Sequence, residues 1–185
     1  MKDDFMLRFG FMMMVCALML APLRPAAAAD PLEAFYGQFT GEAEELGKNE
    51  TARRNLDVMI GPYKRGFTVE WTTVIYRAGG KTKHANFSIN FRRMGKGGLY
   101  RSAMRVNSFG QEVPLDPLDG SPYVWAVLAG KTLTIHSLII LADGDYEMQS
   151  YVRTLTGTGM DVTFSRIRNG SKLKDLHARL KRVTY

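Results

Sequence analysis

The clearest pattern along the chain is an alternation of apolar and polar residues with a period of two. In the segment 84–92, HANFSINFR, Phe87, Ile89 and Phe91 fall on one face and the polar residues fall on the other. Successive side chains of a β-strand point to opposite faces, so this period is typical of a half-buried strand. The same alternation recurs in the segments 67–75, 133–141 and 160–164.

Short glycine-containing turn signals separate these segments. Asp143-Gly144 and Asn169-Gly170 are the strongest, because Asp-Gly and Asn-Gly suit the tight turn of a β-hairpin. The final segment, 171–185, fits either a helical stripe or a strand, and the Asn169-Gly170 turn before it favours a tenth strand. The pattern predicts strands over 35–44, 53–60, 66–77, 82–93, 99–106, 123–128, 132–142, 146–155 and 160–168.

Nine or ten antiparallel strands must hide their edges from other chains. A closed up-and-down barrel does so most completely, and a two-sheet β-sandwich is the main alternative. We therefore expect a single all-β domain, most simply a barrel. The one long irregular link, 107–122, contains prolines that cannot donate a hydrogen bond to a ladder.

The first 29 residues follow a different pattern, which is typical of a secretory signal peptide. Lys2 and Arg8 precede an apolar run over 9–23, and Ala27-Ala28-Ala29 supplies small residues for cleavage. The apolar run is shorter than the ~20 residues of a membrane span, although a retained anchor is the alternative. We expect cleavage before Asp30, a mature domain over 30–185, and a periplasmic or secreted location without an integral membrane segment.

Cleavage would change the chemistry available to the chain. Cys16, the one cysteine of the sequence, is removed with the leader. The mature domain would therefore contain no cysteine for a disulfide or for a thiol nucleophile. The mature domain keeps 22 basic and 16 acidic residues, a net charge of +6. The basic C-terminal segment is expected to form a solvated, positively charged face or, as the alternative, to contact an anionic envelope surface, through Lys172, Lys174, Arg179, Lys181 and Arg182. A basic patch can also attract nucleic acid, but export argues against that partner.

One short motif resembles a known superfamily. Gly37-Gln38-Phe39 opens the first predicted strand, and Arg179 or Arg182 lies on the last. This arrangement resembles the lipocalin-like barrels of the calycin superfamily, many of which carry Gly-x-Trp on the first strand under an arginine from the last. The resemblance implies a barrel and a cavity for an apolar molecule. It implies no particular ligand residue.

Motifs for catalysis or metal binding are weak in this sequence. The mature chain contains neither the G-x-S-x-G turn of hydrolases nor the H-E-x-x-H motif of zinc proteases. His84, His136 and His177 lie on separate segments, and the first two fall on polar faces, so we expect surface histidines. We predict no cofactor and no metal. Carboxylates from distant strands can still converge, which keeps a barrel-type isomerase or hydrolase as a third possibility.

The predicted inner face mixes aromatic rings with small hydroxyl groups, as a partly hydrated ligand cavity does. We therefore predict an exported carrier for an apolar or amphipathic molecule, such as a lipid or fatty acid, that performs no chemistry. Tyr100, Ser102 or an inward arginine would meet the polar end of the ligand. The alternative is an envelope scaffold that uses the basic C-terminal surface. The predicted cavity residues are Trp71, Thr73, Phe87, Ile89, Phe91, Tyr100, Ser102, Met104, Ser137, Ser150 and Phe164.

Overall fold

The structure, a computed structural model, describes residues 30–45 and 53–184, most of which form β-strands. The strands are β1 (Gly37–Glu45), β2 (Arg54–Tyr63), β3 (Gly66–Tyr76), β4 (Thr82–Met94), β5 (Leu99–Ser102), β6 (Arg105–Val106), β7 (Glu112–Val113), β8 (Tyr123–Ala129), β9 (Thr132–Ile140), β10 (Tyr146–Leu155), β11 (Gly159–Arg168) and β12 (Ser171–Arg182). Short 3-10 helices occur at η1 (Glu33–Phe35), η2 (Ala78–Gly80) and η3 (Pro117–Asp119).

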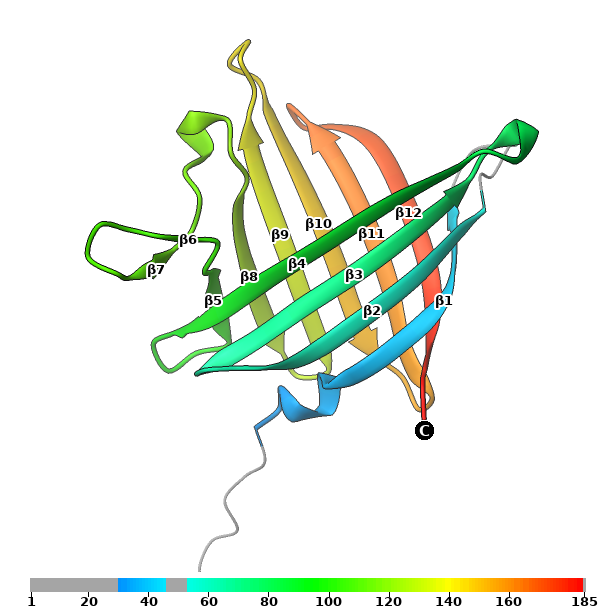
Figure 1. The fold of residues 1–185 in the computed structure, drawn as a ribbon, viewed down its shortest axis with the longest axis horizontal. Coiled ribbons are helices and arrows are strands. Elements are labelled where there is room, and N and C mark those ends of the chain that lie inside the picture. The colour runs from blue at the N-terminus through cyan, green and yellow to red at the C-terminus, as the bar shows by residue number, and fades with distance from the viewer. Residues whose placement is uncertain (1–29, 46–52, 185) are drawn as a thin grey trace, which may run out of the picture.

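Ten of these strands close into one antiparallel barrel. Around the barrel they run β1, β2, β3, β4, β5, β8, β9, β10, β11 and β12, and β12 pairs back with β1. Figure 1 shows β1 to β4 crossing one side of the barrel while β8 to β12 form the other. The prediction of an all-β, up-and-down barrel is confirmed, and the β-sandwich alternative is wrong. The ambiguous final segment is a strand, as the hairpin before it indicated.

One predicted strand, 99–106, is shorter than expected. β5 ends at Ser102, after which the N–H of Ala103 donates to the carbonyl of Asn90 and the N–H of Met104 donates to the carbonyl of Val113. The chain therefore leaves the barrel and forms the separate hairpin of β6 and β7. This hairpin and η3 occupy the link that the prolines had indicated as irregular.

The barrel is packed at the end where β1 begins and β12 ends, which we call the closed end. The helix η1 lies there, below the barrel in Figure 1, and its Phe35 and the preceding Leu32 are buried. The rings of Phe67 and Phe91 stack with centroids 4.8 Å apart, and Tyr100 meets Phe67 edge-on at 5.1 Å. Buried aromatic and aliphatic side chains contribute about 1.5–3 kcal/mol each, so most of the core energy lies at this end.

Arg182 fastens η1 to the last strand. The sequence left Arg179 and Arg182 as candidates for the arginine over the first strand, and the structure shows that it is Arg182. Its guanidinium lies 4.4 Å from the centroid of the Phe39 ring and donates hydrogen bonds to the carbonyls of Ala34 and Tyr36. Gly37 has φ +132°, and a Cβ there would lie 2.8 Å from Nη1 of Arg182. The Arg182 guanidinium therefore accounts for both residues of the Gly-x-Phe motif, because it leaves no room for a Cβ at Gly37 and lies over the ring of Phe39. Arg179 instead pairs with Asp161 on the surface.

We expect the substitution Arg182→Ala to lower the free energy of unfolding by about 2 kcal/mol. Hydrogen bonds from a charged donor contribute about 1.5–3 kcal/mol, and the contact with the Phe39 ring adds to them. Chemical denaturation of Arg182→Ala and Arg179→Ala measures the difference. The exposed pair of Arg179 is expected to change stability by less than about 1 kcal/mol. Equal losses in the two variants would show that Arg182 does not fasten η1.

The predicted signal peptide, residues 1–29, lies outside the described residues. In residues 30–45 and 53–184, helices are short, and none has the length and apolar character needed to cross a membrane.

Candidate functional site

A cavity of about 290 Å³ occupies the barrel toward its other end, where β1 ends and β12 begins, which we call the open end. This volume lies near the lower limit of small-molecule sites, which run from about 300 to 1,000 Å³. The lining residues are Ala43, Arg54, Leu56, Val58, Trp71, Thr73, Ile75, Ala85, Phe87, Gln149, Tyr151, Arg153, Val162, Phe164, Arg166, Lys174, Leu176, Ala178 and Leu180.

Four aromatic rings form a continuous row along the cavity. Phe87 stacks on Trp71 with centroids 5.0 Å apart, Trp71 lies 5.7 Å from Tyr151, and Tyr151 lies 4.7 Å from Phe164. The rings come from β4, β3, β10 and β11, so the row crosses from one side of the barrel to the other. Phe87 keeps 52% of its surface exposed although it belongs to the inner row. The cavity is therefore open to solvent on that side.

Arg153 forms the deepest charged part of the cavity lining. It is 2% exposed, and its Nε and Nη1 atoms have no hydrogen-bond partner in the described part of the chain. Its guanidinium lies 5.3 Å from the ring centroid of Tyr151 and 5.9 Å from that of Trp71. Burial lowers the pKa of Arg153 to about 10, so the side chain remains charged at neutral pH. Buried charges are normally paired, which makes this arginine unusual.

The acidic residue nearest in sequence on the same face already has a partner. Glu147 is buried and accepts hydrogen bonds from Arg166 and from Nε2 of Gln149, the latter at 2.8 Å. The hydrogen bond from Arg166 is the main reason why the pKa of Glu147 is lowered. Tyr151 donates a hydrogen bond of 3.4 Å to Oε1 of Gln149. Glu147 is thus neutralised by Arg166 and does not compensate Arg153.

The charge of the lining is one-sided. Arg54, Arg153, Arg166 and Lys174 all line the cavity, and the described lining contains neither aspartate nor glutamate. A cavity with apolar walls and only basic charged groups favours anionic over cationic or neutral polar ligands.

The structure places the predicted cavity residues in different environments. Trp71, Thr73, Phe87 and Phe164 line the cavity. A second group faces inward but is packed into the closed end, and consists of Ile89, Phe91, Tyr100 and Ser102. Ser137 faces inward opposite Val124 without reaching the lining, and Met104 lies beyond the end of β5, away from it. Tyr100 and Ser102 therefore cannot meet the polar end of a molecule in this cavity.

The prediction that Ser150 faces the interior is wrong. Tyr151 pairs with the buried Ile135, so the odd-numbered residues of β10 face inward. Ser150 pairs with His136 on the outside, where its Oγ lies 2.9 Å from Nδ1 of the histidine. The same shift of one residue brings Gln149, Tyr151 and Arg153 inside, and sequence reasoning did not identify these as site residues.

The five basic residues predicted to form one anionic-surface contact are divided among different places. Lys174 lines the cavity, Arg182 fastens η1, Lys172 pairs with Asp175, and Arg179 pairs with Asp161. Lys181 is exposed on the outward row of β12. Alternation along a single strand separates side chains onto two faces, so a basic run in sequence is not a basic patch in space.

The histidines do not assemble a metal site. His136 lies on the outer face, stacked on Trp125 at 5.0 Å, and is half-buried rather than exposed as expected. Desolvation lowers its pKa. His84 is exposed on β4. Residues 30–45 and 53–184 hold no group of three or more histidine, cysteine, aspartate or glutamate side chains suited to a metal ion.

The fold and the cavity define a ten-stranded barrel with a small, apolar-walled, basic interior. No protein-family model and no curated protein matches the chain. Among solved structures, the chain is similar to a redesigned β-barrel, with a TM-score of 0.41 and 8% sequence identity. The match covers 86% of this chain and 100% of the designed one.

Proposed function

We propose that the protein binds an anionic amphipathic small molecule, such as a fatty acid, in the cavity of its barrel. The observation that carries the proposal is the fully buried, unpaired guanidinium of Arg153 beneath a row of aromatic rings. A carboxylate, sulfate or phosphate group can accept two parallel hydrogen bonds from one guanidinium. The apolar walls suit the hydrocarbon part of such a molecule.

The ligand would bind with its charged group inward. Hydrogen bonds between charged groups away from water contribute about 1.5–3 kcal/mol each, whereas exposed ion pairs contribute about 0.2–1 kcal/mol. Arg153 is buried, and Lys83 at the edge of the open end is exposed. The inner position is therefore favoured, with the tail lying along Trp71, Phe87 and Phe164 toward the opening.

The proposal includes export and membership of the calycin-like barrels. The leader pattern over 1–29 supports a periplasmic or secreted protein. The contact between Arg182 and the Phe39 ring supports a lipocalin-like arrangement of the first and last strands. The scaffold alternative relied on a basic C-terminal surface, and its residues are divided between the cavity, η1 and the outer face.

The test compares dodecanoate with dodecanol, which differ in the charged group. We expect the protein to bind dodecanoate at least tenfold more tightly than dodecanol, as followed by the fluorescence of Trp71 beside Arg153. Mass spectrometry of organic extracts of the natively purified protein should reveal an anionic amphiphile. The intact mass of the same sample shows whether the exported chain begins at Asp30.

A matched pair of variants locates the binding. Thr73 lines the cavity and Thr72 belongs to the outward row of the same strand. We expect Thr73→Trp to abolish binding by filling the cavity, and Thr72→Trp to leave it unchanged. If the wild-type protein binds neither compound and carries none when purified, the proposed function is wrong. Equal affinity for acid and alcohol would instead contradict the role of Arg153.

A further inference from the structure

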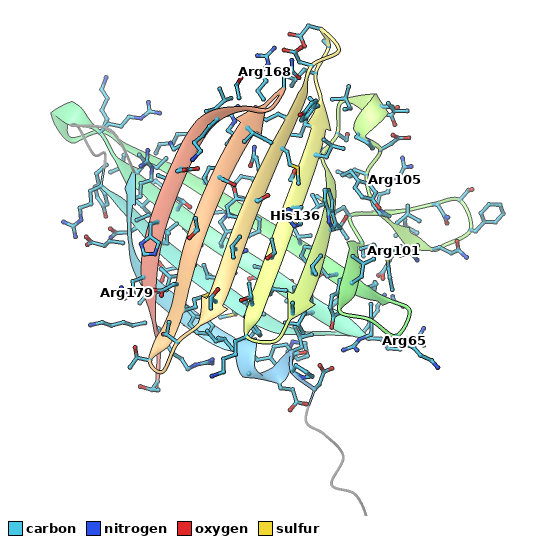
Figure 2. The ribbon with its side chains drawn as sticks, turned by 180° about the vertical axis from the view of Figure 1, so that it is seen from behind. Arg65, Arg101, Arg105, His136, Arg168 and Arg179 are labelled. Atoms are coloured by element: carbon cyan, nitrogen blue, oxygen red, sulfur yellow. The ribbon has the colours of Figure 1, made fainter. Side chains whose placement is uncertain are left out.

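We propose that one flank of the barrel, independent of the cavity, docks onto the surface of an anionic lipid bilayer. We call it the β5–β7 flank. It consists of the turn residue Arg65, the β4–β5 turn with Lys96, strand β5, and the β6–β7 hairpin with its tip at Phe109. Figure 2 shows Arg65, Arg101 and Arg105 along the same side of the molecule.

The charge of this part of the chain is one-sided. From Trp71 to Gln111 the sequence contains no aspartate or glutamate, although it contains eight lysines and arginines. Arg92 and Arg93 pair with Glu112 and Asp30. Within the described chain, the flank cations form no ion pair, namely Arg65, Lys96, Arg101 and Arg105. Cations that form no ion pair are attracted to the negative surface potential of an anionic leaflet.

Large apolar side chains are exposed among these cations. Phe109, at the hairpin tip, is 85% exposed, and Val106 is 65% exposed. Leu99 of β5 is also exposed, as are Met94 at the end of β4 and Met104 between β5 and β6. Most of the large apolar side chains that the described chain exposes lie between Tyr76 and Phe109, within its acid-free stretch. Exposed apolar side chains cost free energy in water, and their combination with cations is the composition of membrane-surface segments.

Hydrogen bonds fix the conformation of the hairpin tip and its position relative to the barrel. Oδ1 of Asn107 accepts hydrogen bonds from the backbone N–H groups of Phe109 and Gln111, at 3.0 and 2.9 Å. Glu112 at the base of the hairpin accepts hydrogen bonds from Tyr63 and Arg92 and pairs with Lys64, which ties β7 to the barrel. The network therefore keeps the Phe109 ring in water, where it can insert between lipid headgroups.

The strand next to β5 adds residues suited to the same environment. Trp125 pairs with Arg101 across β5 and β8 and contacts Tyr123, with centroids 5.8 Å apart. Tryptophan and tyrosine favour the headgroup level of a bilayer, because each carries an apolar body and a polar group. The flank thus combines cations with exposed apolar side chains, and half-buried aromatic rings lie beside it on β8. An acidic protein partner is the competing occupant, and it would require neither the apolar side chains nor lipid.

The experiment measures sedimentation of the full mature chain with vesicles of phosphatidylcholine, with or without a quarter of phosphatidylglycerol. We expect binding to the anionic vesicles only, falling steeply as salt rises. The double variant R101E/R105E should lower the partition coefficient at least tenfold, because it replaces two attracted cations with repelled anions. The double variant K81E/K83E changes the net charge equally, on the η2 hairpin, and should retain most of the binding.

A second pair of variants tests the apolar contribution. Phe109→Ser should weaken binding several-fold, whereas Leu118→Ser should not, although Leu118 is 82% exposed. Leu118 lies in η3 between Asp116 and Asp119, where an anionic surface is repelled. Equal losses of vesicle binding in R101E/R105E and K81E/K83E would show that binding depends only on net charge, and would overturn the proposal. Absence of binding to anionic vesicles, or no effect of Phe109→Ser, would overturn it as well. These outcomes are independent of dodecanoate binding.

Discussion

Arg153→Met is expected to raise the free energy of unfolding of the ligand-free protein by about 1–4 kcal/mol. Methionine fills a similar volume without a charge, so the substitution removes the cost of burying an unpaired guanidinium. Burial lowers the pKa of Arg153 from its usual value to about 10, which corresponds to roughly 3 kcal/mol against the charged form. Because the folded-state pKa is the lower one, this cost is present in full below about pH 10, including neutral pH.

The same variant should lose its preference for dodecanoate over dodecanol. Urea denaturation measures the gain in stability, and titration with the two probes measures the loss of selectivity. Arg153→Lys serves as the conservative control, because it keeps the charge but not the planar pair of donors. We expect it to bind dodecanoate more weakly than the wild type and to remain less stable than Arg153→Met. A destabilised Arg153→Met protein would show that the contacts of Arg153 with the Tyr151 and Trp71 rings are structural.

The barrel itself was predictable because alternation and turn chemistry agree over most of the chain. Asn169-Gly170 illustrates this agreement. Both residues have positive φ, 48° and 79°, and Arg168 pairs directly with Ser171, which is the two-residue hairpin expected from the sequence. The register of β11 and β12 follows from this turn, apart from a bulge after Arg166.

The cavity residues of β10 were not predictable, because a similar dipeptide forms a different turn. A two-residue turn at Asp143-Gly144 would pair Ser137 with Ser150, which matches the face predicted for both serines. The actual loop is closed by a hydrogen bond from the N–H of Leu141 to the carbonyl of Asp145, and Ser137 pairs with Gln149. A shift of one residue exchanges the two faces of a strand. Hydrophobicity reinforced the error, because the outward Met148 is more apolar than the inward Glu147.

The β5–β7 flank could not be predicted from the sequence pattern either, for a different reason. The acid-free stretch from Trp71 to Gln111 is visible in the sequence, but its cations lie on strands, turns and a hairpin that only the fold assembles. The C-terminal cations gave the stronger local signal, yet strand alternation separates them. Local charge density therefore predicted the wrong surface, and the long absence of acidic residues was the more informative feature.

Phe91→Ala is expected to lower the free energy of unfolding by about 3–5 kcal/mol, whereas Phe87→Ala should cost about 1 kcal/mol. The two phenylalanines lie four residues apart on the inner row of β4 and are equivalent in the sequence pattern. Phe91 is 0% exposed and stacks on Phe67 in the closed end. Phe87 is 52% exposed and loses little more than its stacking on Trp71.

Denaturant unfolding of the two variants, with unchanged m-values, measures the difference. Phe87→Ala should also weaken dodecanoate binding, because the ring belongs to the cavity wall. Its small effect on stability separates that loss from misfolding. Equal costs for the two substitutions would mean that the interior is packed to the same density along its whole length. In that case there would be no room for a ligand, and the binding proposal would fail together with the asymmetry between the two ends of the barrel.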